Sequence, residues 1–240
     1  MEVRTEVTQR KARLLALAGL LSFLAIWCVL SYTGLVPTVI LPSPTEVIRA
    51  FPVLHFEEAL VRSAGWSLYR VGMGFVLSAL VAIPLGLLMG TFPAVKHFLS
   101  PLVDPLRFLP ISALVPLFLV WFGIEETMKI MLLFVGTLVY LQTATTLGAS
   151  RWQLVRHVLV PGSLPAIGEA LRVMNGIGWT YVILAEIVNA RLGLGHIITV
   201  AGKRSHVDQI FAGVLVILFI GVVTDAMIRI ANKQLFAWKS

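Results

Sequence analysis

The sequence predicts an all-α, polytopic membrane protein with about six transmembrane helices. Of its 240 residues, 58% are hydrophobic and only 13% are charged, and the mean hydropathy is +0.91. Soluble domains average about 45–50% apolar and about 25% charged residues. Several stretches also approach the roughly 20 apolar residues that a helix needs to cross a bilayer. The composition therefore excludes a soluble globular enzyme, a disordered chain and a disulfide-rich secreted domain.

The apolar runs divide the chain into an N-terminal tail, residues 1–13, and a membrane domain, residues 14–240. The predicted spans cover residues 14–32, 71–95, 108–124, a short fourth from residue 130, 166–188 and 210–228. The fourth has about eleven apolar residues before a polar stretch, which reach about 16 Å, or half of a hydrocarbon core of about 30 Å. We therefore expect either a half-buried helix or a chain that lacks residues between Thr137 and Tyr140.

A turn and a short amphipathic helix are predicted between the first two spans. Pro42 and Pro44 favour extended backbone in the residues before them. Ser43 or Thr45 can cap the helix that follows. Apolar residues then recur at helical spacing up to Leu54, so we expect a helix lying at the membrane interface.

The distribution of lysine and arginine predicts the orientation. Six spans place both termini on one side, together with residues 91–107 and 141–160, and that side carries eleven basic residues against six on the other. The positive-inside rule makes it the cytoplasmic side. The net charge of +7 needs no nucleic acid to explain it, since no basic tract with interleaved aromatic residues is present.

The cytoplasmic segment 141–165 predicts a short helix, a break at Gly148 and a second amphipathic helix. Trp152, Val155 and Leu159 lie on one face of the second helix. A short helix with a bulky apolar stripe suits insertion into a groove of a partner protein. The alternative is a helix that lies among the lipid headgroups.

This segment resembles the EAA loop of binding-protein-dependent ABC importer permeases. The family's Glu-Ala-Ala, Gly and Leu-Pro positions correspond to Gln142-Thr143-Ala144, Gly148 and Val160-Pro161, so the family's carboxylate is absent here. Residues 35–238 resemble the nitrate, sulfonate, taurine and bicarbonate branch. The wider motifs are Leu41-Pro42-Ser43-Pro44, Ser67-Leu68-Tyr69-Arg70-Val71, Ile83-Pro84-Leu85-Gly86, Pro110-Ile111-Ser112-Ala113-Leu114-Val115-Pro116, Leu147-Gly148-Ala149-Ser150 and Ala185-Glu186 before Gly193-Leu194-Gly195.

The resemblance implies that residues 14–240 form the transmembrane permease domain of an ATP-driven ABC importer. It would move a small oxyanion (nitrate, bicarbonate, or an organosulfonate such as taurine) into the cytoplasm. Its partners would be a second permease copy, two ATP-binding subunits, a periplasmic or lipid-anchored substrate-binding protein, and membrane lipid. The chain would lie in the bacterial inner membrane with both termini in the cytoplasm.

The chain itself is not expected to be an enzyme or to hold a cofactor. It contains no phosphate-binding Gly-x-x-x-x-Gly-Lys-Ser/Thr motif, so ATP and Mg would bind the partner ATPase. A coupling helix in segment 141–165 would dock on that ATPase. The residues that the resemblance assigns to this coupling are Gln142, Ala144, Gly148, Ala149, Arg151, Trp152, Val155, Val160 and Pro161. Members of the branch also carry about twenty more residues between Thr137 and Tyr140, so we expect Val139 and Tyr140 to be too far apart for a peptide bond.

Polar residues inside the spans are the candidates for a transport pathway, because charges in a bilayer usually face a cavity or each other. The candidates are Arg70, Arg172, Asn175, Trp179 and Glu186, on the second and fifth predicted spans, with the third span as a further wall. Arg70 either extends to the outer interface or faces an anion. Arg172 can pair with Glu169, three residues earlier, as a structural pair or gate. Glu186 is interpreted as a structural residue bound to the turn at residues 193–195.

The five histidines are scattered without metal-ligand spacing, and no Ser/His/Asp arrangement is recognisable. We therefore expect no metal site and no catalytic residues. An intramembrane enzyme is one alternative function. A secondary transporter or channel that acts without an ATPase is the other.

Overall fold

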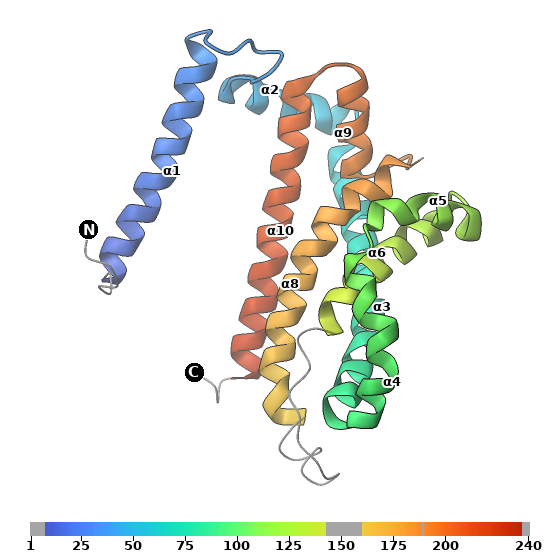
Figure 1. The fold of residues 1–240 in the computed structure, drawn as a ribbon. Helices are drawn as coiled ribbons and strands as arrows, with labels where there is room; N and C mark the ends of the chain where they lie inside the picture. Colours follow the sequence, from blue (N-terminus) through green and yellow to red (C-terminus); the bar gives the residue numbers. More distant parts are fainter. Residues whose placement is uncertain (1–7, 143–159, 189, 237–240) are drawn as a thin grey trace.

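The computed structural model describes residues 8–142, 160–188 and 190–236, and every regular element in these ranges is a helix. Long helices run roughly side by side, with short helices at both ends and along one side (Figure 1). Helix α1 begins at the same end of the molecule at which helix α10 ends (Figure 1). The predicted all-α class is confirmed.

Helix α2, Pro44–Phe56, begins with the cap that the sequence predicts. The backbone N–H of Ser43 donates to Glu46 Oε2 at 2.7 Å, and the Ser43 hydroxyl accepts from the backbone N–H of Glu46 at 3.4 Å. Val47 and Leu54 are buried, and α2 packs against α10. The predicted short helix is confirmed, and part of its apolar face is covered by α10.

Four helices form the bundle: α3, Leu60–Thr91; α6, Glu126–Gln142; α8, Val160–Ile187; and α10, Val207–Leu235. Helix α6 packs between α3 and α8, and α10 packs against α8 and the short helix α9, Leu194–Lys203. A Cβ at Gly74 of α3 would come within 2.7 Å of the Leu133 side chain, so glycine permits the close approach of α6. Nearby, the Ser78 hydroxyl donates to the Phe134 carbonyl oxygen at 2.7 Å.

The third predicted span, residues 108–124, contains a helix of only 12 residues, α5, instead of the full crossing that we expected. Helix α4, Pro93–Val103, is joined to α5, Ile111–Phe122, by the 3₁₀ turn η1, Asp104–Phe108, and the chain bends by 99° between Pro93–Leu106 and α5. Pro110 has extended backbone and lacks the N–H that would continue a helix. Within the described residues, three helices (α1, α3 and α10) are long and apolar enough to cross a membrane, or four if the bent pair counts as one.

The fourth and fifth predicted spans correspond to α6 and α8. Helix α6 has 17 residues, about 25 Å at 1.5 Å per residue, and continues through Val139 and Tyr140. The helix shows no break between these two residues. Helix α8 has 28 residues and is long enough to cross a bilayer.

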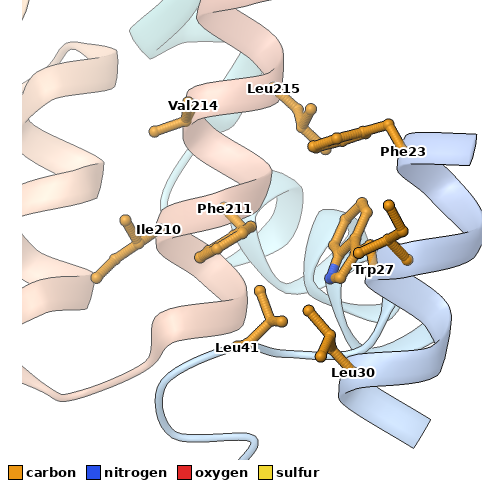
Figure 2. Close-up of a pocket in the computed structure, with 9 residues that line it drawn as sticks. Phe23, Trp27, Leu30, Leu41, Ile210, Phe211, Val214 and Leu215 are labelled. Carbon is orange, nitrogen blue, oxygen red and sulfur yellow. The ribbon is translucent and has the colours of Figure 1, made fainter. Parts of the chain in front are cut away.

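Helix α1, Gln9–Tyr32, stands apart from the bundle over most of its length (Figure 1). It is attached near its end, where the Trp27 indole N–H donates to the Pro42 carbonyl oxygen at 2.9 Å. An apolar groove of about 550 Å³ separates it from α10. Figure 2 shows Trp27 and Phe23 of α1 facing Phe211 and Leu215 of α10 across this groove. Its lining suits lipid chains, so the groove requires no polar occupant.

Candidate functional site

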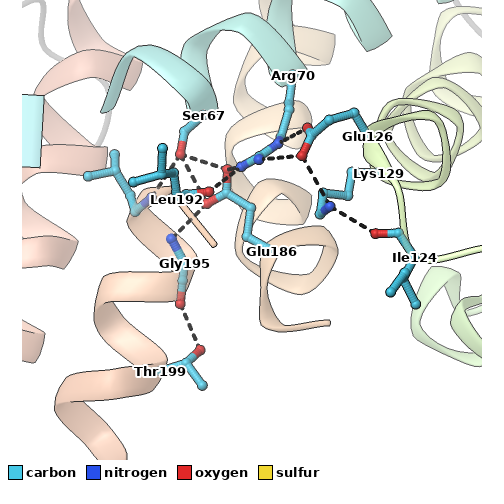
Figure 3. A network of polar contacts seen from close by, with 10 residues as sticks. Ser67, Arg70, Ile124, Glu126, Lys129, Glu186, Leu192, Gly195 and Thr199 are labelled. Carbon is cyan, nitrogen blue, oxygen red and sulfur yellow. Dashed lines mark hydrogen bonds and ion pairs between the residues drawn. The ribbon is translucent and has the colours of Figure 1, made fainter. Parts of the chain in front are cut away.

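A buried ion cluster joins α3, α6 and α8 and is centred on Arg70 of α3 (Figure 3). Two guanidinium nitrogens, Nε and Nη2, donate to the carboxylate of Glu126 at 2.6 and 2.8 Å. Nη1 donates to Glu186 Oε1 and to the Leu192 carbonyl oxygen, both at 2.7 Å. Lys129 Nζ adds a second cation, 3.2 Å from Glu126 Oε1. Two cations and two carboxylates thus balance each other.

Arg70 neither extends to the outer interface nor faces an open cavity. Its side chain is 2% exposed and lies ten residues inside α3. Both alternatives that the sequence offered for Arg70 are therefore wrong: the guanidinium is directed into the bundle because two carboxylates there satisfy its donors. Sequence reasoning missed Glu126 as the partner, because this residue lies before the fourth predicted span, which begins at residue 130.

Glu186 of α8 is fully buried and holds the turn that precedes α9. Its carboxylate accepts from the Ser67 hydroxyl at 2.7 Å and from the Gly195 backbone N–H at 2.8 Å. Gly193 has a φ of +138°, and a Cβ there would overlap the Glu186 carboxyl group. The contact with the turn at residues 193–195 is the one that the sequence predicts for Glu186. Because Glu186 is fully buried, this pathway candidate lines none of the grooves described here.

A second polar group lies on α8 and α10, toward the end of the bundle where α8 begins. Arg172 donates from Nε and Nη2 to the two carboxylate oxygens of Asp225, each at 3.0 Å. Arg172 Nη1 also donates to Glu169 Oε2 at 2.8 Å, as the spacing predicts. Sequence reasoning missed Asp225 as a partner. The available signal was its position as an acidic residue inside the sixth predicted span.

Asn175 and Trp179 share a face of α8, but that face is directed at α10. The Asn175 amide donates to Thr224 Oγ1 at 3.0 Å, and the Trp179 indole N–H donates to the same oxygen at 3.1 Å. Asn175 is 6% exposed and Trp179 is 4% exposed. Both residues therefore serve as the packed wall between the two helices.

A groove of about 570 Å³ lies between α8 and α10 beside these residues, called here the α8–α10 groove. It is lined by Arg172, Asn175, Gly176, Trp179, Thr180, Ile183, Val214, Ile217, Leu218, Gly221, Val222 and Asp225. Among them, Gly176, Thr180, Val214, Leu218 and Val222 are exposed, and Arg172 and Asp225 are partly exposed. The structure thus brings Arg172, Asn175 and Trp179 together and keeps Arg70 and Glu186 in the separate ion cluster.

Most of the predicted coupling residues lie outside the described residues. Gln142 is the last residue of α6, and Val160 and Pro161 begin α8. Those outside are Ala144, Gly148, Ala149, Arg151, Trp152 and Val155. Among the residues that the structure describes, no group of three His, Cys, Asp or Glu side chains is arranged to hold a metal ion.

Comparison with known proteins shows the family. Residues 139–236 match the family described as the binding-protein-dependent transport system inner membrane component. A taurine transport system permease of Escherichia coli is 30% identical, over 93% of this chain and 89% of that protein. A Bacillus subtilis protein named as an aliphatic sulfonates transport permease is 30% identical over 90% and 84%. A bicarbonate transport system permease of Synechococcus elongatus is 29% identical over 90% and 86%.

The relatives are longer than this chain inside the matched region. The alignment with the taurine permease runs over 245 positions, although 93% of 240 residues is about 223, so about 22 positions find no counterpart here. The family match begins at residue 139, where the sequence predicts residues to be lacking. With permeases of this kind aligned over nearly its whole length, the chain belongs to the binding-protein-dependent transport inner membrane components, the multi-pass permeases of ABC transporters.

Proposed function

We propose that this chain is the permease subunit of an ATP-driven importer for a small oxyanion. The candidate substrates are an organosulfonate such as taurine, bicarbonate and nitrate. The observation that carries the proposal is that permeases named for sulfonates, taurine and bicarbonate align with 90–93% of the chain. The names differ in substrate but share one chemistry, a compact anion with several oxygen atoms.

The proposed importer contains two copies of this chain, two ATP-binding subunits and an external substrate-binding protein. ATP and Mg bind the ATPase subunits, and the coupling segment 141–165 transmits their closure to the spans. The end of the molecule where α6 ends and α8 begins would then face the cytoplasm. Helix α1 begins and α10 ends at this same end, which supports a cytoplasmic location for both termini (Figure 1).

Uptake by the purified complex tests this function. The chain is co-expressed with a candidate ATPase and a candidate binding protein, reconstituted into vesicles, and supplied with labelled taurine, bicarbonate or nitrate. We expect the ATPase to co-purify and uptake of one anion to require both ATP and the binding protein. Uptake by the chain alone, without an ATPase, would instead establish a secondary transporter or channel.

A further inference from the structure

The α8–α10 groove contains charged and polar side chains at a depth where a bilayer is apolar. Arg172 lies twelve residues after the start of α8, and Asp225 lies ten residues before the end of α10. These separations correspond to about 18 and 15 Å along the helices. Both residues are therefore well inside helices that are long enough to cross the membrane.

Lipid suits the exposed apolar residues of this groove, Val214, Leu218 and Val222, but it is a poor cover for the polar ones. Arg172 is 26% exposed and Asp225 is 37% exposed, so neither member of the pair is sealed by protein. Thr180 is exposed, and nothing lies within 4 Å of a Cβ built at Gly176. Charged residues at membrane depth usually face other protein or a water-filled cavity, because hydrocarbon offers them no hydrogen bonds.

Arg172 has the geometry that an oxyanion requires. Its planar guanidinium already binds two oxygen atoms of one carboxylate, those of Asp225, at 3.0 Å each. Sulfonate, bicarbonate and nitrate present the same paired oxygens, and such bidentate contacts are the strong form of arginine–anion recognition. Arg70 differs, because it is 2% exposed and its two carboxylate partners hold it inside the bundle.

We propose that the α8–α10 groove is the inner, water-filled part of the anion pathway, and that Arg172 is the group that the passing anion contacts. Asp225 and Glu169 are the internal anions that occupy Arg172 until the substrate takes their place. Asn175 and Trp179 act as positioning residues, since both are fastened to Thr224 and form the back wall. This inference rests on the proposed function, with the open side of the groove facing the second copy of the chain.

Thiol labelling tests the groove without requiring transport. Cys28 is the only cysteine, so Cys28→Ala provides a cysteine-free background. Gly176→Cys and Thr180→Cys are treated in vesicles with a charged, water-soluble methanethiosulfonate reagent. Leu80→Cys is the matched control, because Leu80 is 67% exposed on α3 and lines none of the grooves described above.

We expect Thr180→Cys and Gly176→Cys to react and Leu80→Cys to stay unreactive, with added taurine, bicarbonate or nitrate slowing the reaction. If Gly176→Cys fails to insert into the membrane, Thr180→Cys still provides the test, because cysteine is similar in size to the threonine that it replaces. Reaction no faster than at Leu80 would overturn the inference. So would a disulfide between two copies at residue 176 together with no labelling, because the groove would then be a dry contact between copies.

Uptake kinetics test the role of Arg172. In the reconstituted complex, Arg172→Gln should raise the KM for the anion about ten- to a hundredfold, the effect of losing a hydrogen bond between charged groups. Asp225→Asn should lower the KM, because it removes one of the two internal competitors, the other being Glu169. Arg204→Gln is the control, since Arg204 pairs with Glu58 on the opposite end of the bundle, outside the groove.

The two proposals fail separately in these experiments. If the unmodified complex takes up no anion, the proposed importer function fails, whereas the labelling still reports whether the groove is wet. If the unmodified complex transports normally and Arg172→Gln has an unchanged KM, Arg172 is a structural residue and this inference fails alone.

Discussion

Replacing Arg70 by methionine removes the centre of the buried ion cluster. The substitution keeps an unbranched side chain of similar reach but eliminates four hydrogen bonds, two to Glu126, one to Glu186 and one to the Leu192 carbonyl oxygen. The consequences for the two carboxylates differ. Glu126 is 38% exposed and keeps Lys129 as a partner, whereas Glu186 is fully buried and, among the described residues, keeps the uncharged donors of Ser67 and Gly195.

The expected cost follows from the burial of Glu186. Removing one partner of a buried ion pair destabilises a protein by about 3–5 kcal/mol, because the remaining charge is left without compensation. For a chain of this size, that corresponds to a fall in melting temperature of about 6–20 °C. Arg204→Gln breaks an exposed pair instead and should cost about 0.2–1 kcal/mol.

In the assay, the detergent-purified chain is heated to a series of temperatures. The fraction that remains monodisperse at each temperature is measured by size-exclusion chromatography. A double-variant comparison isolates the cause. Arg70→Met with Glu186→Gln should recover more stability than Arg70→Met with Glu126→Gln, since only the first removes a buried, uncompensated charge. If Arg70→Met loses no more stability than Arg204→Gln, or if the two double variants are equal, the reasoning is refuted.

Four further outcomes are expected. Gly193→Ala should lower the melting temperature, because a Cβ would overlap the Glu186 carboxyl group at a φ of +138°. Ser43→Ala should cost about 1 kcal/mol of stability, the usual effect of losing a helix N-cap. The hydrogen bonds from the Ser43 backbone and hydroxyl hold the pKa of Glu46 below its ordinary value, so this carboxylate stabilises α2 at neutral pH and loses that effect as acid protonates it. Thermal unfolding against pH should therefore show a fall below about pH 4.3 that Glu46→Gln reduces. Trp152→Glu should prevent co-purification of the ATPase while membrane insertion persists, because a carboxylate in an apolar groove costs several kcal/mol.

Matched variants control these measurements. Gly72→Ala should change the melting temperature little, since nothing lies within 4 Å of a Cβ at that position. Gln153→Glu places the same charge one residue from Trp152 and should leave the ATPase bound. Equal effects of Gly193→Ala and Gly72→Ala would contradict the role of the turn, and equal losses of ATPase at residues 152 and 153 would contradict docking through the tryptophan face.

The sequence by itself determined the class of the protein and its helices. The length and apolarity of the runs suffice to predict α1, α3, α8 and α10. In lipid, the backbone N–H and C=O groups must be hydrogen-bonded within the protein, and a helix achieves this within a single segment. The cap of α2 is equally local, since Ser43 and Glu46 are three residues apart. The family motifs were also readable as sequence.

Only the tertiary structure decided which charges meet. Arg70 and Glu186 are 116 residues apart, and Arg172 and Asp225 are 53 residues apart, so no helical periodicity relates them. Their pairing depends on which faces of α3, α6, α8 and α10 pack together. That packing buried Arg70 and left Arg172 beside a groove, although both are arginines within predicted spans. The physical reason is that the environment of a charge in a membrane protein is set by neighbouring helices, which local sequence does not specify.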